Sequence, residues 1–356
     1  MNRKNLTILI VLLVIITYLS ACDNDKSSVS KNTSTKPETS KVSTAEEQTN
    51  SVQPEKKEDA KKNDFVFPID GIRPMAVMID NEGNRPLPQG GLYKAQVIYE
   101  IIVEGGVTRL MPVFWNTEPE MIGPVRSSRH YFIDYAMEHD AIYVHFGYSP
   151  QALSDLKKFK INNVNGVANG GEVFWDLTKD RYNWQDSYTS PQKVSAYTKR
   201  VKYRTTTDKK SVFSFNTEDT ALVDGQKAEK ILVKYSNDYK CSYVYDTATS
   251  MYMRFRKDKP HTDRITKDQL SAKNIIIQYV GNNRIKGDTK DRQELGNVGK
   301  GKGLFITNGK VIEITWSKAS RTAPTKYNDT NGNAIRLNPG QTWIQIVPKS
   351  NPASIS

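Results

Sequence analysis

Apolar and polar positions form their clearest pattern between residues 97 and 114, where two runs rich in β-branched and aromatic residues flank a pair of glycines. Gly105-Gly106 is a signal for a two-residue hairpin turn, so the pattern predicts two antiparallel strands. In that register the facing pairs are Glu104 with Val107, Ile102 with Arg109, and Glu100 with Met111.

Side chains alternate between the two faces of such a ribbon, so this register places Glu100, Glu104 and Arg109 on one face. Arg109 is then diagonal to both acids. The remaining positions are largely apolar on both faces, which is expected of strands inside a domain. Charged groups in that setting need one another or a ligand.

The rest of the N-terminal part alternates between strand and helix signals. Strands are predicted where apolar runs are short, and helices where a serine or proline begins a longer pattern. The expected elements are strands over residues 73–80 and 141–146, a helix capped by Ser127 or Ser128 and ending near Glu138, and a helix opened by Ser149-Pro150.

After about residue 212 the pattern changes to short β runs separated by turn signals, and the only weak helical periodicity is near Asp263–Leu270. The folded part spans residues 65–356, which is more than one small core usually organises. We therefore predict an α+β fold, with a mixed α/β domain over 65–205 and a β-rich domain over 206–350. The predicted C-terminal strands are Lys230–Tyr235, Cys241–Tyr245, Met251–Arg256, Asn274–Val280, Gly303–Thr307, Val311–Ser317 and Thr342–Val347.

Arg3 and Lys4 precede a 14-residue apolar run, Leu6 to Leu19, which is too short for a membrane span of ~20 residues. Small residues precede Cys22, as in a bacterial lipoprotein signal peptide over residues 1–21. Cleavage there would leave Cys22 as a lipid-bearing N-terminus, with diacylglycerol and palmitate as the expected modifications. The polar residues 22–64 predict a disordered tether that reaches about 35–40 Å. The protein is thus expected on the outer face of the cytoplasmic membrane.

Charge is unevenly distributed along the chain. Residues 65–205 hold 16 Lys+Arg against 15 Asp+Glu, whereas residues 206–356 hold 25 against 15, a net charge of +10. Outside a cell this basic surface would meet anionic wall polymers or lipid head groups, and nucleic acid is not an expected partner. A solvated surface without a partner explains the charge equally well. Cys241 is the only other cysteine, which excludes an intramolecular disulfide framework and favours a buried, inert thiol.

Five segments of the chain are distinctive: RPMAVMIDN, VIYEIIVEGGVTRL, IGPVRSSRHYFIDYA, YVHFGYSPQA and LNPGQTWIQIVP. They resemble the domain-of-unknown-function 3048 (DUF3048) family, which includes the YerB-type bacterial lipoproteins. The resemblance covers essentially all of residues 65–350 and implies an N-terminal α/β domain and a C-terminal β-rich domain on a lipid anchor. It implies no established activity. The family pattern has Pro-His-Asn where this chain has Trp184-Gln185-Asp186, so no role is expected for a histidine there.

Arg126 and Arg129 lie at the start of a predicted helix, where free backbone N–H groups and the helix dipole favour an anion. The guanidinium fork suits a carboxylate or a phosphate. If Arg109 joins them, three arginines share few acids. The alternative is that they pair with nearby carboxylates and only hold the domain together. The candidate ligand-binding residues are Asp80, Asn81, Glu104, Arg109, Arg126, Arg129 and His145.

Catalytic chemistry has weaker support in the sequence. Glycan cleavage needs two carboxyl groups ~5–9 Å apart, but Glu100 and Glu104 are about 13 Å apart along one strand. Asp80 could join Glu104 only if the first strand lies beside the hairpin. The four histidines lack metal-ligand spacing, and no metal or cofactor is expected. Trp184 stands in a polar run and is the tryptophan expected to be exposed.

The sequence leaves two functions open. The first is a non-catalytic binding or scaffold lipoprotein of the cell envelope, with an arginine-lined anion site and with anionic wall polymer, peptidoglycan or an envelope protein as its partner. The second is a peptidoglycan hydrolase that uses Glu104 and Asp80 as acid and base.

Overall fold

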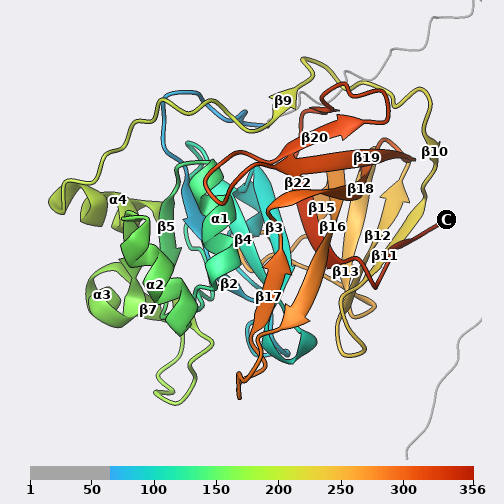
Figure 1. Ribbon diagram of the computed structural model, residues 1–356. Coiled ribbons are helices and arrows are strands. Elements are labelled where there is room, and N and C mark those ends of the chain that lie inside the picture. Colours follow the sequence, from blue (N-terminus) through green and yellow to red (C-terminus); the bar gives the residue numbers. More distant parts are fainter. Residues whose placement is uncertain (1–64) are drawn as a thin grey trace, which may run out of the picture. The chain divides into compact units, whose positions relative to one another are not determined.

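A computed structural model describes residues 65–356 of the chain (Figure 1). The predicted signal peptide, Cys22 and the tether lie outside these residues. Within residues 65–356 no helix is both long and apolar enough to cross a membrane. The described part contains few helices and many strands, and the predicted α+β fold is confirmed.

A thirteen-stranded mixed sheet runs through the described part of the chain. Its central strands are buried along their whole length, which confirms that the apolar hairpin lies inside the protein. Along the sheet the strands are, in order, β10 (Gln226–Lys227), β19 (Lys310–Lys318), β18 (Gly299–Thr307), β16 (Asn274–Arg284), β22 (Thr342–Pro348), β3 (Val97–Ile102), β4 (Thr108–Phe114), β1 (Met75–Val77), β5 (Ile142–His145) and β6 (Asn163–Asn165), with β17 (Gln293–Gly296), β2 (Ile79–Asp80) and β20 (Lys326–Asp329) paired at the side.

The N-terminal and C-terminal parts share this sheet. Strand β22, near the end of the chain, pairs in parallel with β3 on one side and with β16 on the other. Thr342 lies opposite both Val97 and Asn274. Backbone hydrogen bonds therefore join the two parts, and the domain boundary near residue 205 stays a prediction.

A six-stranded antiparallel sheet from the C-terminal part packs against one face of the large sheet. Tyr235 directly follows the strand Lys230–Lys234 of this sheet, and it donates a hydrogen bond to the backbone oxygen of Glu100 in β3, at 2.8 Å. All seven predicted C-terminal strands are present. The strands of this sheet are β14 (Lys259–Pro260), β13 (Met251–Arg256), β12 (Lys240–Asp246), β11 (Lys230–Lys234) and β23 (Ser354–Ile355), with β15 (Ser271–Ala272) beside β13.

The helices belong to the N-terminal part, and Figure 1 shows α2, α3 and α4 grouped beside β5. Ser149 caps α2 by accepting from Ala152 N at 3.2 Å, as predicted. The expected serine cap of α1 is wrong. Its N-cap is Arg129 without a side-chain bond, because Ser128 instead accepts from the buried Tyr143 hydroxyl. The helices are α1 (His130–Glu138), α2 (Pro150–Lys158), α3 (Gly166–Val173) and α4 (Pro191–Arg200), with short 3-10 turns η1 (Leu92–Lys94) and η2 (Glu104–Gly106).

The segment Asp263–Leu270 is not helical. The Asp263 carboxylate accepts from the backbone N–H of Ile265 and of Tyr93, and this local turn competes with a helix. A bridge between Thr262 and Gln269 closes the segment as a loop. Two short ribbons complete the fold, β7 (Trp175–Asp176) with β8 (Ser187–Tyr188) and β9 (Ser214–Phe215) with β21 (Arg336–Leu337).

The hairpin turn contains three residues and not the predicted two. Val103 N donates to Val107 O at 2.8 Å, and Glu104–Gly106 forms the turn between them. Both glycines have positive φ, +65° at Gly105 and +70° at Gly106. Glycine adopts a positive φ without steric cost, so Gly105 and Gly106 can both take this conformation. The turn can therefore hold a third residue, Glu104, in addition to the two glycines.

The extra residue shifts the register by one and exchanges the faces of one strand relative to the other. Arg109 pairs with Ile101, and Glu100 pairs with Leu110. The prediction that Glu100 and Arg109 share a face is therefore wrong, because alternation now sends them to opposite sides of the sheet.

Candidate functional site

Three arginines meet at the start of α1, and two carboxylates lie among them. Arg126 forms an ion pair with Asp80 at 3.0 Å. Arg129 donates two hydrogen bonds to Glu104, and the Nη2–Oε2 bond is 2.7 Å. Arg109 donates to the backbone oxygen of Ser127 at 2.5 Å and is 4.0 Å from Glu104. We call these five side chains the arginine cluster.

Cationic charge in the arginine cluster is incompletely neutralised. Burial, together with the charges of Arg129 and Arg126, lowers the pKa of Arg109 to about 9. Burial also lowers the pKa of Arg126. Two carboxylates form ion pairs with the three guanidinium groups, and the charge of Glu82 also acts on Arg126. An additional anion beside Arg109 would stabilise the charged form of Arg109.

The environment of Glu104 does not suit a proton donor. Burial alone would raise its pKa, but the hydrogen bonds and charge of Arg129, together with Arg109, lower the pKa below its ordinary value. Glu104 is therefore ionised at neutral pH. A general acid needs a raised pKa instead.

Asp80 is fully buried and its carboxylate is held from several sides. It accepts from Gln185 Nε2 at 2.9 Å and from Glu82 N at 2.9 Å, in addition to its ion pair with Arg126. Asp80 and Glu104 are thus bound to different arginines. This arrangement leaves neither carboxylate free for acid–base chemistry.

The arginine cluster reaches the surface at Trp184. The Arg126 guanidinium stacks on the Trp184 ring, 3.9 Å from the ring centroid, and Trp184 is 50% exposed. The side chains of Arg126 and Glu104 keep about a fifth of their surface, 20% and 21%. An anion arriving from solvent can therefore meet Arg126 beside an aromatic ring. The expectation that Trp184 is exposed is confirmed.

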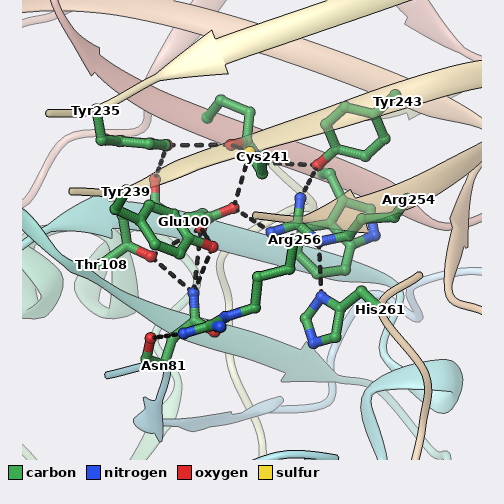
Figure 2. Close-up of polar contacts among 12 residues, drawn as sticks. Asn81, Glu100, Thr108, Tyr235, Tyr239, Cys241, Tyr243, Arg254, Arg256 and His261 are labelled. Carbon is green, nitrogen blue, oxygen red and sulfur yellow. Dashed lines mark hydrogen bonds and ion pairs between the residues drawn. The ribbon is translucent and has the colours of Figure 1, made fainter. Parts of the chain in front are cut away.

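Asn81 and Glu100 lie in a separate network on the opposite face of the sheet. Asn81 follows Asp80 directly, so alternation turns its side chain away from the arginine cluster. Its amide donates to Thr108 Oγ1 at 2.8 Å and to Tyr239 OH at 2.7 Å, and its carbonyl accepts from Arg256 Nε. Figure 2 shows these groups converging between the two sheets.

An ion pair without solvent contact forms the centre of this network. Arg254 Nη2 donates to Glu100 Oε2 at 2.7 Å, and both side chains are 0% exposed. The guanidinium also stacks on Trp343, 4.0 Å from the ring centroid. Tyr239 donates to the other oxygen of Glu100. With Glu100 and Arg254 closed off from water, the network joins the two sheets rather than lining an open site (Figure 2).

The histidines occupy interior positions. His145 Nδ1 lies 2.8 Å from Gly147 O and its Nε2 lies 3.0 Å from Asn163 Oδ1, and the neutral ring donates to one of these two oxygens. Burial lowers its pKa and keeps the ring neutral. His145 therefore supports the turn next to Ser128 without pointing a free nitrogen at the arginine cluster. Among residues 65–356 no group of three or more His, Cys, Asp or Glu side chains could hold a metal.

Both parts of the chain match known domains. Residues 68–204 match the family described as "Protein of unknown function (DUF3048) N-terminal domain", and residues 231–344 match its C-terminal domain. The chain belongs to the DUF3048 family. It is 32% identical over 290 residues to "Putative lipoprotein YerB" of Bacillus subtilis (strain 168). The matched region covers 80% of this chain and 84% of that relative. The crystal structure of the YerB protein from Bacillus subtilis superimposes with a TM-score of 0.71 at 31% identity, covering 80% of this chain and 94% of that one.

The sequence pattern of this DUF3048 protein did not reveal several residues that belong to the arginine cluster or to the Glu100 network. Gln185 bonds Asp80 from more than one hundred residues away, and no local signal marks it. The sequence does contain a signal for Arg254 and Arg256. They alternate with Met253 and Phe255 in β13, so they must share one face of the strand with the buried Tyr252. Two arginines on a buried face of a strand indicate an acidic partner across the interface.

Cys241 lies in the Glu100 network, and burial raises the pKa of its thiol. The thiol contacts Gln345 Oε1 at 3.3 Å. A raised pKa disfavours the reactive thiolate. This environment fits the predicted inert cysteine.

Proposed function

We propose that this protein is a lipid-anchored binding protein of the cell envelope that holds an anion at the arginine cluster and performs no catalysis itself. The observation that carries the proposal is the charge imbalance around Arg109, where three guanidinium groups share two carboxylates. Trp184 supports it, since a half-exposed aromatic ring stacked on Arg126 provides a surface for a ligand.

The proposed location of the protein rests on Cys22 and on the family to which the chain belongs. The apolar run and small residues before Cys22 favour cleavage and lipidation, and a relative bears the name of a lipoprotein. Mass spectrometry of membrane-extracted protein should find an N-terminal diacylglyceryl-cysteine. Cys22→Ser should abolish this modification and release the protein from membranes; unchanged membrane retention of a cleaved Cys22→Ser chain would reject the anchor.

The expected ligand group is a carboxylate or a phosphate. Both match the planar fork of arginine, and both occur in the extracytoplasmic wall zone as peptide termini and anionic polymers. The net charge of +10 on residues 206–356 supports a second, less specific contact with anionic polymer, and that contact should weaken with added salt.

Titration of the chain without residues 1–22 tests the anion site. Inorganic phosphate and N-acetyl-alanine, a model for a peptide carboxylate, should each bind, and the stronger of the two identifies the natural ligand group. Arg126→Gln should weaken binding about tenfold or more, because a charge-assisted hydrogen bond contributes about 1.5–3 kcal/mol.

Arg181→Gln is the matched control, since Arg181 is exposed and, within residues 65–356, its guanidinium hydrogen-bonds and stacks only with its neighbour Tyr182. Equal binding by the wild type, Arg126→Gln and Arg129→Gln would reject the site. The lowered pKa of Glu104 and the fully bonded Asp80 favour binding over the peptidoglycan hydrolase alternative. Release of wall fragments by the wild type, and its loss in Glu104→Gln, would reverse that preference.

A further inference from the structure

Three exposed lysines lie on one face of the large sheet, on the neighbouring strands β18, β19 and β20 (Figure 1). Side chains of directly paired residues point to the same face of a sheet. The register therefore forms two rows across the three strands, Lys300 with Ser317 and Lys326, and Lys302 with Thr315 and Asn328. We call these six residues the lysine face.

The residues that alternate with the lysine face point into the protein. Trp316 and Tyr327 are 3% and 5% exposed, and they pair with each other across β19 and β20. In β18 the alternate position is Gly301, where a Cβ would lie only 2.7 Å from Trp316 Nε1. Trp316 Nε1 also donates to Tyr279 O at 3.0 Å. The buried tryptophan thus holds the strand from which two of the lysines project.

Positive charge on the lysine face is not neutralised by any neighbouring acid. The six residues include no acid, and the side chains of the three lysines make no ion pair or hydrogen bond within residues 65–356. The hydroxyl groups of Thr315 and Ser317 have no partner there either. Along β19 the same face next carries an acid at Glu313, beyond the two rows. The lysine face therefore offers free cations with free hydroxyl donors between them.

Strand geometry places the three cations close enough to act together. Lys300 and Lys302 are two positions apart on one strand, about 7 Å between Cα atoms, and Lys326 is two strands away from Lys300, about 10 Å. These separations are close to the Debye length of about 8–10 Å at physiological ionic strength, so the three potentials add. A single small anion cannot contact all three, whereas a chain of regularly spaced anions can.

We infer that the lysine face binds a linear polymer that carries a phosphate group in each repeat unit. Lysine binds phosphate as a point charge, and serine and threonine hydroxyls donate to phosphate oxygens. The six residues include no large apolar or aromatic side chain, which disfavours insertion into a lipid interface and stacking on nucleic-acid bases. The inference rests on the proposed contact between the basic C-terminal half and anionic polymer, and it assigns that contact to one surface.

Lysine footprinting on the full lipidated chain in an uncharged polyoxyethylene detergent tests the inference. The protein is acetylated briefly with and without long-chain inorganic polyphosphate, and mass spectrometry compares the reactivity of each lysine. Polyphosphate should lower the reactivity of Lys300, Lys302 and Lys326 several-fold. The internal controls, which should not change, are the exposed lysines Lys157, Lys179 and Lys199 of the N-terminal part.

Two matched variants remove the same charge from different surfaces. The test variant is Lys300→Gln, Lys302→Gln and Lys326→Gln, and the control is Lys157→Gln, Lys179→Gln and Lys199→Gln. The test variant should bind polyphosphate about a hundredfold more weakly, since a lysine beside an anionic surface contributes about 1 kcal/mol. Its slope of log K against log salt should decrease by about 2–3. The control should keep most of the affinity, and equal melting temperatures should confirm that both variants fold.

Equal loss of affinity in the two variants would overturn the inference, because overall charge would then explain the binding. Pyrophosphate should bind far more weakly than the polymer, and equal affinity for pyrophosphate would also overturn it. The third arm uses the full chain in vesicles without polymer. Protection of the three lysines in phosphatidylglycerol vesicles, but not in phosphatidylcholine vesicles, would assign the lysine face to the membrane instead.

Failure of the lysine face is distinguishable from failure of the proposed function. Polyphosphate binding that leaves the three lysines reactive would overturn the inference while the proposed polymer contact stands. Arg126→Gln should decrease orthophosphate binding at the arginine cluster and leave the polyphosphate protection of the lysine face intact.

Discussion

Single residues in this protein are assigned to one face of the sheet or the other by strand alternation and by the hairpin turn, in which Glu104 lies. Glu100 and Glu104 belong to the same hairpin, yet Glu104 pairs with Arg129 and Glu100 pairs with Arg254. The two ion pairs differ in solvent contact. The Glu104 side chain is 21% exposed, and the Glu100 side chain is closed to water.

Glu100→Gln should therefore be strongly destabilising. It leaves the buried Arg254 without its counter-charge, which typically costs about 3–5 kcal/mol of unfolding free energy. Urea denaturation at pH 7 measures the change. The control is Glu172→Gln, which breaks a half-exposed pair with Arg200 and should cost less than about 1 kcal/mol. Similar small losses in both variants would contradict this view of Glu100.

At the scale of elements, the turn of the β3–β4 hairpin determines which face each charged side chain occupies. Its third residue reverses the parity of β4 relative to β3, and this reversal sends Arg109 to the arginine cluster and not to Glu100. Gly106 also touches the other sheet, where its backbone oxygen accepts from Ser236 Oγ at 2.7 Å. The turn is thus both a connection and a contact.

Gly106→Ala should destabilise the protein more than Gly105→Ala does. Both positions have positive φ, which costs a residue with a Cβ roughly 1–2 kcal/mol. A Cβ at Gly106 would also lie 2.7 Å from Ser236 Cβ, whereas a Cβ at Gly105 meets nothing within 4 Å. Thermal unfolding measures both variants.

Ser236→Gly removes the atom that would clash and should recover part of the extra loss in the Gly106→Ala background. The double-mutant cycle isolates the clash from the backbone strain. Equal destabilisation by the two alanine variants would show that the Ser236 contact does not limit this position.

The whole molecule depends on strand β22, which comes from the end of the chain and lies between β3 and β16. Residues 65–205 alone would expose the edge of β3 and would leave Glu100 without Arg254. We expect that fragment to lack a cooperative unfolding transition. Co-expression with residues 206–356 should restore it, as measured by circular dichroism. Cooperative unfolding of the isolated fragment would show that the two domains fold independently.

Acid should destabilise the whole molecule well above the range where carboxylates titrate. All four histidines are buried, and burial is the largest cause that lowers the pKa of each one. Between the folded and the unfolded pKa the unfolded chain binds more protons, so stability is complete above about pH 6.5 and falls as pH decreases.

His139, whose pKa falls to about 4, should alone account for about 2 kcal/mol between pH 7 and pH 5. Asp134 acts in the opposite sense, because burial raises its pKa to about 6 and its neutral form gains as pH falls. Urea titrations at several pH values should show a net loss toward pH 5 that becomes shallower in His139→Gln. An unchanged slope would remove His139 from this account.

The sequence by itself determined the α+β class, the family, the seven C-terminal strands and the arginine-rich start of α1, because local periodicity, turn residues and family motifs carry those signals. It also predicted that Arg109, Arg126, Arg129 and Glu104 lie together, for which proximity along the chain was a sufficient guide. Only the tertiary structure decided the parity of the hairpin, since one extra turn residue exchanges every side chain between faces. The partners of Glu100 likewise required the fold, because Arg254 approaches Glu100 from the second sheet and no local pattern encodes that contact.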